Sequence, residues 1–237
     1  MVDRSQGRPT PVRAGQGCAT VLLERARNVK SISHQTLNLP THAPVMVLPE
    51  ATLFPNALLP LHIFEPRYRA MLAWALERQR MFCVALMKSG ISEAESPEDF
   101  YHTAGLGLVR ACVQRADGTF DLVLQGLARV RFAGFVEEKP FRIAHVRELS
   151  SRPAPQVQAE ALATKLLELC GELRAHSDGI PEKLGEQLAK LTDPEMLGDV
   201  VAHTFLQDAY RRQQLLEEEE VGERLRALVR HLREQLG

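Results

Sequence analysis

The sequence predicts an α+β fold in which a mostly antiparallel β-sheet, typical of small barrels and sandwiches, is followed by a C-terminal α-helical bundle. Short apolar runs with turn residues between them occupy the chain up to residue 149. Apolar residues then recur at helical spacing from residue 157 to the end. A proline-containing segment, residues 151–156 (SRPAPQ), separates the two patterns. Strands followed by helices in this way are typical of the α+β class.

The chain before the first strand has a different composition. Residues 1–43 are mostly polar and contain several prolines and glycines, so we expect a disordered or loosely packed leader. Ordered structure is expected to begin at residues 44–49 (PVMVLP), a β-prone run bounded by prolines. The predicted organisation is therefore a leader over 1–43, a β-sheet domain over 44–150 and a helical bundle over 156–237.

Residues 53–68 (LFPNALLPLHIFEPRY) place three prolines in one of the most apolar segments of the chain. Proline lacks a backbone donor, so it is not expected inside a central strand or a helix. We predict that Pro55 lies in a turn, that Pro60 lies where the sheet does not need its N–H, and that Pro66 begins a helix. Apolar residues at helical spacing continue that helix over residues 66–79.

The following segments read as strands. Residues 81–87 (MFCVALM) form an apolar run of strand length, and a Ser/Glu-rich loop follows it at residues 89–99. From residue 104 apolar and polar residues alternate, and Asp117-Gly118 supplies the positive φ of a tight hairpin. In the strand after Gly126, the face that carries Arg129 and Arg131 is expected to be largely solvated. We expect about five to seven strands in total.

Four segments near the C-terminus carry leucine-rich apolar residues at helical spacing. Their packing is expected to form a bundle with its own core. One helix is expected to begin with Asp193 as N-cap and Pro194 at the first helical position. The four segments are 157–173, 180–191, 193–205 and 221–236.

Composition excludes several classes of protein. The chain has 237 residues, 45% of them apolar, and a formal net charge of −1, so no overall positive charge draws it to nucleic acid. The four cysteines, Cys18, Cys83, Cys112 and Cys170, form no Cys-x-x-Cys pair, which indicates a reducing compartment. There is no apolar run of membrane-spanning length and no signal-peptide block. We expect a cytoplasmic protein without a membrane partner.

Motifs for catalysis are absent from the sequence. Gly105-Leu-Gly107 lacks the third glycine of a dinucleotide fingerprint and lies in a strand pattern, so close strand packing explains it better. The chain contains no phosphate-binding loop, no zinc-protease motif and no serine-hydrolase elbow. We therefore assign no catalytic residue, no cofactor and no metal, and we expect the protein not to be an enzyme.

Several motifs together resemble a known family. In order, they are residues 44–49 (PVMVLP), 60–68 (PLHIFEPRY), Gly105-x-Gly107, the Asp117-Gly118 hairpin and 124–130 (LQGLARV). They resemble the N-terminal substrate-binding domain of the ATP-dependent protease Lon, and a looser similarity continues into the helical part. This resemblance implies a PUA-like β-barrel followed by a helical bundle. In that family the ATPase and protease modules follow the helical region, whereas this sequence ends there, at Gly237. The expectation that follows from the resemblance is a stand-alone substrate-binding domain without either activity.

The resemblance suggests a non-enzymatic module that recognises proteins or peptides through unfolded or exposed apolar segments. Such binding needs exposed apolar surface or an open strand edge. Phe54, Phe64 and Phe135 are the candidate contact residues, and burial in the core is the alternative role for each of them. Phe135 is a candidate because it lies on the otherwise polar face of its strand.

Two other functions remain open from the sequence. The first is RNA binding, which a PUA-like fold permits, although the chain has no net positive charge and no aromatic stacking platform. The second is a regulatory scaffold that binds another chain through the helical bundle. The arginines that support RNA binding are Arg110, Arg115, Arg129, Arg131, Arg142 and Arg147.

Overall fold

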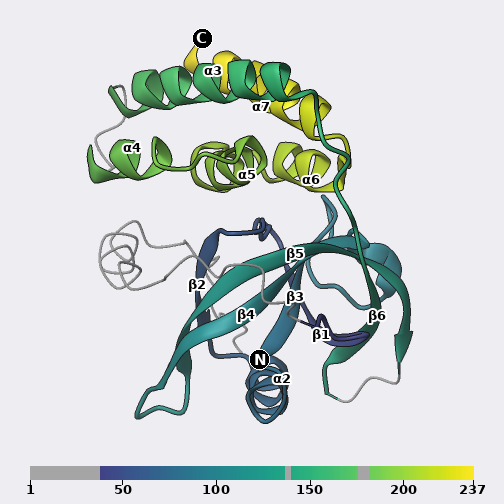
Figure 1. Ribbon diagram of the computed structural model, residues 1–237. Coiled ribbons are helices and arrows are strands. Elements are labelled where there is room, and N and C mark those ends of the chain that lie inside the picture. Colours follow the sequence, from purple (N-terminus) through teal and green to yellow (C-terminus); the bar gives the residue numbers. More distant parts are fainter. Residues whose placement is uncertain (1–37, 137–139, 176–181) are drawn as a thin grey trace, which may run out of the picture. The chain divides into compact units, whose positions relative to one another are not determined.

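The structure is a computed structural model that describes residues 38–136, 140–175 and 182–237. The described residues form an α+β unit in which a mixed sheet is followed by a group of helices (Figure 1). The predicted α+β class is therefore confirmed. Most of the predicted leader lies outside the described residues, and the first strand begins at His42, two residues before the predicted start.

The sheet contains six strands among the described residues. They are β1 (His42–Leu48), β2 (Leu58–Ile63), β3 (Met81–Leu86), β4 (Thr103–Gln114), β5 (Phe120–Val136) and β6 (Arg142–Glu148). The helices are α2 (Pro66–Leu76), the short 3₁₀ helix η2 (Pro97–Asp99), α3 (Gln156–Ala175), α4 (Glu182–Leu188), α5 (Pro194–Phe205), α6 (Ala209–Glu217) and α7 (Val221–Leu236).

The strand order is β2-β5-β4-β3-β1-β6, and β5 also pairs with β6. The pairing of β1 with β3 is parallel and the others are antiparallel, so the sheet is mixed. The long strand β5 pairs with β4 over most of its length and with β6 near its end. The sheet is not a clean barrel, because among the described strands β2 pairs only with β5 and lies outside the ring of the other five.

The three prolines of the 53–68 motif occupy the predicted kinds of position. Pro55 lies in a turn, Pro60 lies in β2, and Pro66 is at the start of α2 with Glu65 as N-cap. Helix α2 is held to the sheet at Tyr68, whose hydroxyl donates a hydrogen bond to the carbonyl oxygen of Val47 at 3.0 Å. The motif therefore joins a turn, an edge strand and a helix.

Two strand glycines allow the loop at residues 53–57 to approach the sheet closely. A Cβ atom on Gly105 would lie 1.9 Å from the carbonyl oxygen of Leu53, and one on Gly126 would lie 1.9 Å from that of Phe54. Only glycine leaves room for these backbone contacts. Gly105 in the Gly-x-Gly motif thus serves packing. Leu53 joins the core under α2, whereas Phe54 joins the core of the helices, so the loop connects the two.

Helices α3 to α7 share one apolar core with Phe54. The predicted start of α5 is confirmed, because the side chain of Asp193 accepts a hydrogen bond from the backbone N–H of Glu195 at 2.9 Å. Helix α6 was not predicted; its amphipathic pattern is short and polar residues dominate it. Of the helices in the described residues, none is long and apolar enough to span a bilayer.

Stability is expected to fall as the pH is lowered from 7 to 5, because of His203 on α5. Its Nε2 lies 3.3 Å from the carbonyl oxygen of Leu58, and burial, with a contribution from Arg212, lowers its pKa from the ordinary value of 6.5 to about 4. Below pH 6.5 the unfolded chain binds the proton first, so stability present at neutral pH is lost towards pH 4.

The expected loss between pH 7 and pH 5 is about 1–2 kcal/mol, measured by urea unfolding at both values. His203→Gln removes the titrating ring and is expected to remove most of this difference. An undiminished pH dependence in that variant would contradict the assignment to His203.

Candidate functional site

The structure does not place Phe54 on the surface. Its side chain is fully buried in the core of the helices, with the Arg129 guanidinium 5.7 Å from the ring centroid. The expectation that Phe54 contacts a partner is therefore corrected: its role is to anchor the 53–57 loop. The sequence signal was ambiguous because an aromatic residue beside a proline turn is compatible with either environment.

Phe64 and Phe135 lie at opposite ends of β5 and do not form one patch. Phe64 directly follows Ile63, the partner of Phe120 at the start of β5, whereas Phe135 pairs with Ala144 near its end. Phe64 is 47% exposed. Phe135 is partly buried and packs edge-on against the rings of Phe100 and Phe132. Peptide contact stays a prediction for both, and the exposure favours Phe64.

Three strands around Phe64 present a partly apolar face to solvent. In β2, β5 and β4, residues directly opposite one another put their side chains on the same face. His62 is opposite Asp121, which is opposite Val113, and the next row is Pro60, Val123 and Ala111. We call this the outer strand face; its members are Leu58, Pro60, His62, Phe64, Ala111, Val113, Asp121 and Val123.

The outer strand face is exposed at its centre, since Val113 is 60% exposed and Ala111 is exposed as well. The opposite face of the same strands is covered by α2 and includes the buried side chains of Leu59, Leu122 and Leu124. Alternation along β2 and β5 thus separates a covered face from an uncovered one.

Polar groups border the apolar part of this face. Asp121 Oδ1 lies 2.8 Å from Nδ1 of His62, and the Arg115 guanidinium donates to Asp121 Oδ2 from Nε at 2.6 Å. These two hydrogen bonds, that from His62 first, lower the pKa of Asp121. The His62 ring also stacks on the ring of Phe64, with centroids 6.0 Å apart. The hydrogen bonds from His62 and Arg115 favour the ionised form of Asp121, and the contact with Asp121 holds the His62 ring beside Phe64.

One edge of the three strands is open to an added strand. β3 pairs with the first half of β4, so within the described part of the chain residues 110–114 pair with β5 alone. The N–H of Arg115 donates a hydrogen bond to the carbonyl oxygen of Thr119, so Arg115 belongs to a hydrogen-bonded pair of the β4–β5 hairpin. Because hydrogen-bonded and non-hydrogen-bonded pairs alternate along antiparallel strands, Val113 points its backbone groups towards β5 as well. The backbone groups of Cys112 and Gln114 therefore point away from β5, towards the open edge.

The other edge, along β2, is blocked. Pro60 has no N–H to donate, and the carbonyl oxygen of Leu58 already lies beside His203 Nε2. Proline on an edge strand is a common protection against unwanted pairing. Strand addition is therefore directed to β4.

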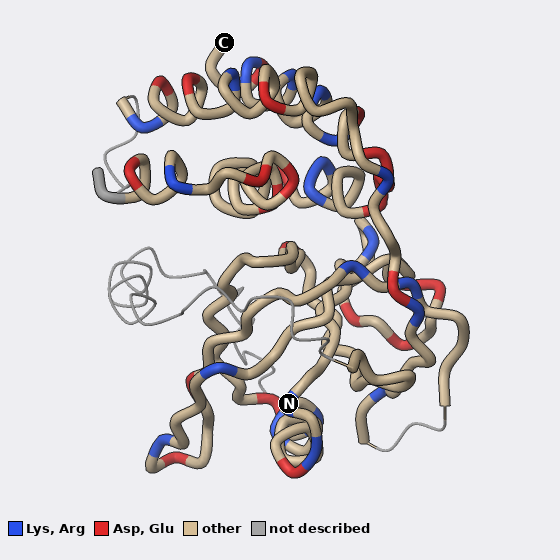
Figure 2. The backbone as a smooth tube through the Cα atoms, viewed as in Figure 1, with Lys and Arg blue, Asp and Glu red and all other residues tan. Residues whose placement is uncertain are grey.

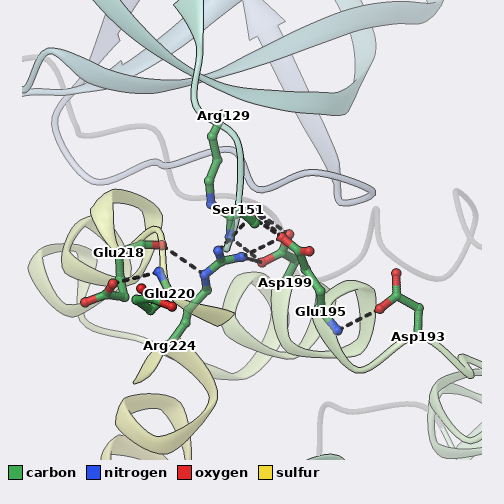
Figure 3. Close-up of polar contacts among 8 residues, drawn as sticks. All are labelled: Arg129, Ser151, Asp193, Glu195, Asp199, Glu218, Glu220 and Arg224. Atoms are coloured by element: carbon green, nitrogen blue, oxygen red, sulfur yellow. Dashed lines mark hydrogen bonds and ion pairs between the residues drawn. The ribbon is translucent and has the colours of Figure 1, made fainter. Parts of the chain in front are cut away.

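A buried ionic cluster joins the sheet to the helices (Figure 3). Arg129 on β5 forms a two-pronged contact with Asp199 on α5, in which Nη1 donates to Oδ2 at 2.9 Å. Arg224 on α7 donates from Nη1 to Glu195 Oε1 at 3.0 Å and to Asp199 Oδ1 at 3.3 Å. Ser151, in the linker, accepts from Arg224 and donates to Glu195.

The charges of the cluster balance, with two guanidiniums and two carboxylates. Burial raises the pKa of Asp199, and the guanidiniums of Arg129 and Arg224 oppose that rise. Burial also acts to raise the pKa of Glu195, but hydrogen bonds from Ser151 and Arg224 outweigh it and lower that pKa. This arrangement pairs the buried charges with one another, although Arg129 Nε is buried without a hydrogen-bond partner among the described residues, and we assign it a structural role.

The solvated position predicted for Arg129 is wrong, because the side chain is 4% exposed in this cluster. The signal that sequence reasoning missed is Asp199, a single carboxylate on the apolar face of α5. A buried carboxylate requires a partner, and Arg129 lies 70 residues away in the sequence.

The six arginines proposed for RNA binding do not all gather on one surface, although Arg131 and Arg147 are exposed and lie directly opposite each other across β5 and β6. Arg129 is buried, Arg115 pairs with Asp121, and the Arg142 guanidinium donates to backbone carbonyls at residues 94 and 95. Most of the strand trace carries neither basic nor acidic residues, and the charged positions on it are isolated (Figure 2). RNA binding is therefore not favoured. The described part of the chain also contains no group of three or more His, Cys, Asp or Glu side chains arranged to hold a metal ion.

Comparison with known proteins gives consistent matches. The chain is 27% identical to a Lon protease from Desulfosudis oleivorans over 202 residues, which is 85% of this chain and 25% of that protein. It is 26% identical to the Lon protease of Dictyoglomus thermophilum, again over 86% of this chain and 26% of the relative. The chain thus spans about a quarter of the length of these curated relatives.

Solved structures match the fold. The N-terminal domain of the Lon protease from the Mycobacterium avium complex matches with a TM-score of 0.64 at 18% identity, covering 81% of this chain and 98% of that one. A Lon N-terminal domain protein from Xanthomonas campestris matches with a TM-score of 0.58 at 20% identity and the same coverage. The family model for the ATP-dependent protease La (LON) substrate-binding domain matches residues 42–234, and the chain therefore belongs to that family.

Proposed function

We propose that this chain is a non-enzymatic recognition module that binds unfolded or exposed apolar segments of other proteins. The family match is to a substrate-binding domain, and the observation that carries the proposal is the outer strand face, where Phe64 and Val113 are 47% and 60% exposed beside an open strand edge. Single exposed apolar residues are common, but an apolar row bordered by charges marks a binding surface.

The geometry suits an extended segment that adds to β4. Its backbone would pair with the groups of Cys112 and Gln114 that point away from β5, and alternate side chains would lie beside Val113 and Ala111 on the same face. Phe64 lies on the far side of β5 from the added strand, so it would contact only a part of the bound segment that crosses the outer strand face, where the Asp121 ion pairs form a polar border. Main-chain pairing gives affinity for many sequences, which suits recognition of unfolded proteins.

The scaffold in this proposal is a PUA-like barrel over residues 44–150, with the helices of 156–237 as a second domain linked to it by the ionic cluster. Catalysis is not part of the proposal, since the match is to the substrate-binding domain of Lon. The reduced thiols Cys83, Cys112 and Cys170 suit action in the cytoplasm.

The test is fluorescence anisotropy with a labelled protein in its reduced, unfolded form and in its native form. The chain is expected to bind the unfolded form only. A Phe64→Ser/Val113→Ser double variant is expected to bind about tenfold more weakly, because two apolar contacts are lost. Val157→Ser is the matched control, since Val157 is 81% exposed but lies on α3.

A second variant, Gln114→Pro, tests the open edge itself. It removes a donor that points away from β5, so it should leave the hairpin folded while weakening binding. Equal binding of the native and unfolded forms would rule out the proposed recognition. Unchanged affinity of the double variant would rule out the outer strand face as its location.

A further inference from the structure

Helices α3 and α7 enclose a groove of about 430 Å³ on the surface of the helical part. Its apolar floor consists of Leu162 on α3 and Val229 on α7, both of which contribute to the shared helical core. The groove is bordered by four cationic side chains and one carboxylate, that of Glu234. The cations are Lys165, Arg226, Arg230 and Arg233.

Among the residues with described positions, two of these cations form no ion pair. Lys165 pairs with Glu168 at 2.8 Å and Arg226 pairs with Glu223 at 2.5 Å, each on its own helix. In the ranges that the structure describes, neither Arg230 nor Arg233 has an ion-pair partner, and both are exposed. The carboxylate of Glu234 lies 2.8 Å from Arg211 on α6, so it is already engaged.

A simple solvated helix face does not explain this arrangement well. Arg226, Arg230 and Arg233 occupy positions i, i+4 and i+7, so like charges lie next to one another along α7. A solvated helix face is usually stabilised by positive and negative side chains that alternate along it. Here α3, which faces α7 across the groove, adds the positive charge of Lys165 and no carboxylate to the lining. The positive charge is local, since the whole chain carries a formal net charge of −1.

We propose that this groove, which we call the basic groove, binds an acidic amphipathic segment of a partner protein. The apolar floor would contact leucine-like side chains, and Arg230 and Arg233 would each bind a carboxylate through charge-assisted hydrogen bonds. Arg230 and Arg233 are separated by about 4.5 Å along the helix axis, slightly less than one turn, which matches carboxylates three or four residues apart on one face of a bound helix. Charge complementarity identifies the occupant as acidic.

The basic groove is independent of the outer strand face. It is built from α3 and α7, whereas the outer strand face is built from β2, β4 and β5. An acidic helix would therefore occupy a second site, so the chain can hold an apolar extended segment and an acidic partner at once. Failure of one proposal leaves the other standing.

The test uses the full chain and a labelled peptide of about sixteen residues with glutamate and leucine at helical spacing, long enough for four turns. Anisotropy is expected to show binding that weakens as salt is raised, and a peptide with glutamine in place of glutamate should bind at least about tenfold more weakly. The Arg230→Glu/Arg233→Glu variant is expected to lose the glutamate peptide and to bind a lysine version instead.

Two controls separate this site from the other. Phe64→Ser should leave peptide binding unchanged, and so should Arg131→Glu, which reverses an exposed charge on β5. Equal affinity for the glutamate and glutamine peptides would overturn the proposal, as would wild-type affinity in the double variant. Tighter binding of a single-stranded oligonucleotide or of phosphatidylglycerol vesicles, lost in the same double variant, would also overturn it.

Discussion

Replacing Arg129 with alanine is expected to lower the free energy of unfolding by about 3 kcal/mol. Arg129 and Asp199 are 4% and 2% exposed at their side chains, so the variant leaves a buried carboxylate without its main partner. The effect lies at the lower end of the range for breaking a buried pair, because Arg224 still contacts Asp199 at 3.3 Å.

Urea unfolding followed by far-ultraviolet circular dichroism and by the fluorescence of Trp74 measures this effect. The sole tryptophan is on α2, under the sheet, whereas circular dichroism mainly reports the helices, so the two signals follow the two parts of the structure. We expect coincident transitions in the wild type and separated transitions in the variant, because the cluster couples the parts.

Arg131→Ala is the matched control, since Arg131 lies two residues further along β5 and is exposed. Its expected effect is within about 0.5 kcal/mol. A loss for Arg129→Ala no larger than that would show that the cluster contributes little. An Arg129→Met/Asp199→Leu double variant is expected to cost less than the sum of the single changes, because it leaves neither charge unpaired.

Gly126→Ala is expected to destabilise the protein by about 3 kcal/mol or more. The new Cβ would meet the carbonyl oxygen of Phe54 at 1.9 Å, and backbone cannot move aside as a side-chain tip can. The same contact is held by two hydrogen bonds of 2.9 Å, from Asn56 N–H to the Gly126 carbonyl oxygen and from Gly126 N–H to that of Ala57. Overpacking therefore also breaks these bonds.

Gly171→Ala provides the comparison within the same chain. Gly171 is exposed inside α3, and an added Cβ there meets nothing within 4 Å. Alanine is expected to stabilise the helix by about 0.5–1 kcal/mol. Thermal unfolding of the two variants should therefore shift in opposite directions. A neutral effect of Gly126→Ala would mean that the 53–57 loop can withdraw from the sheet.

Loosening that loop would also have consequences for binding. Phe54 lies next to His203, with ring centroids 6.4 Å apart, and His203 lies beside the start of β2. The position of the β2 edge thus depends on the packing of the loop and of α5. The outer strand face is held from behind by α2 and at one end by these contacts.

Local patterns of sequence determined the α+β class, the strand-to-helix order, the start of α2 at Pro66 and the cap of α5 at Asp193. These features depend on neighbouring residues, through proline chemistry, capping and side-chain periodicity. The family was also evident from the 60–68 string, because its unusual order of residues carries more information than an apolar pattern.

Only the tertiary structure decided which side chains are available to a partner. Alternation along a strand separates two faces but does not tell which face a distant segment covers. Arg129 is buried because Asp199, 70 residues away, packs against it, whereas Val113 is 60% exposed because no described segment covers it. Burial depends on contacts between residues far apart in the sequence, so Phe54 and Phe64, ten positions apart, have opposite environments.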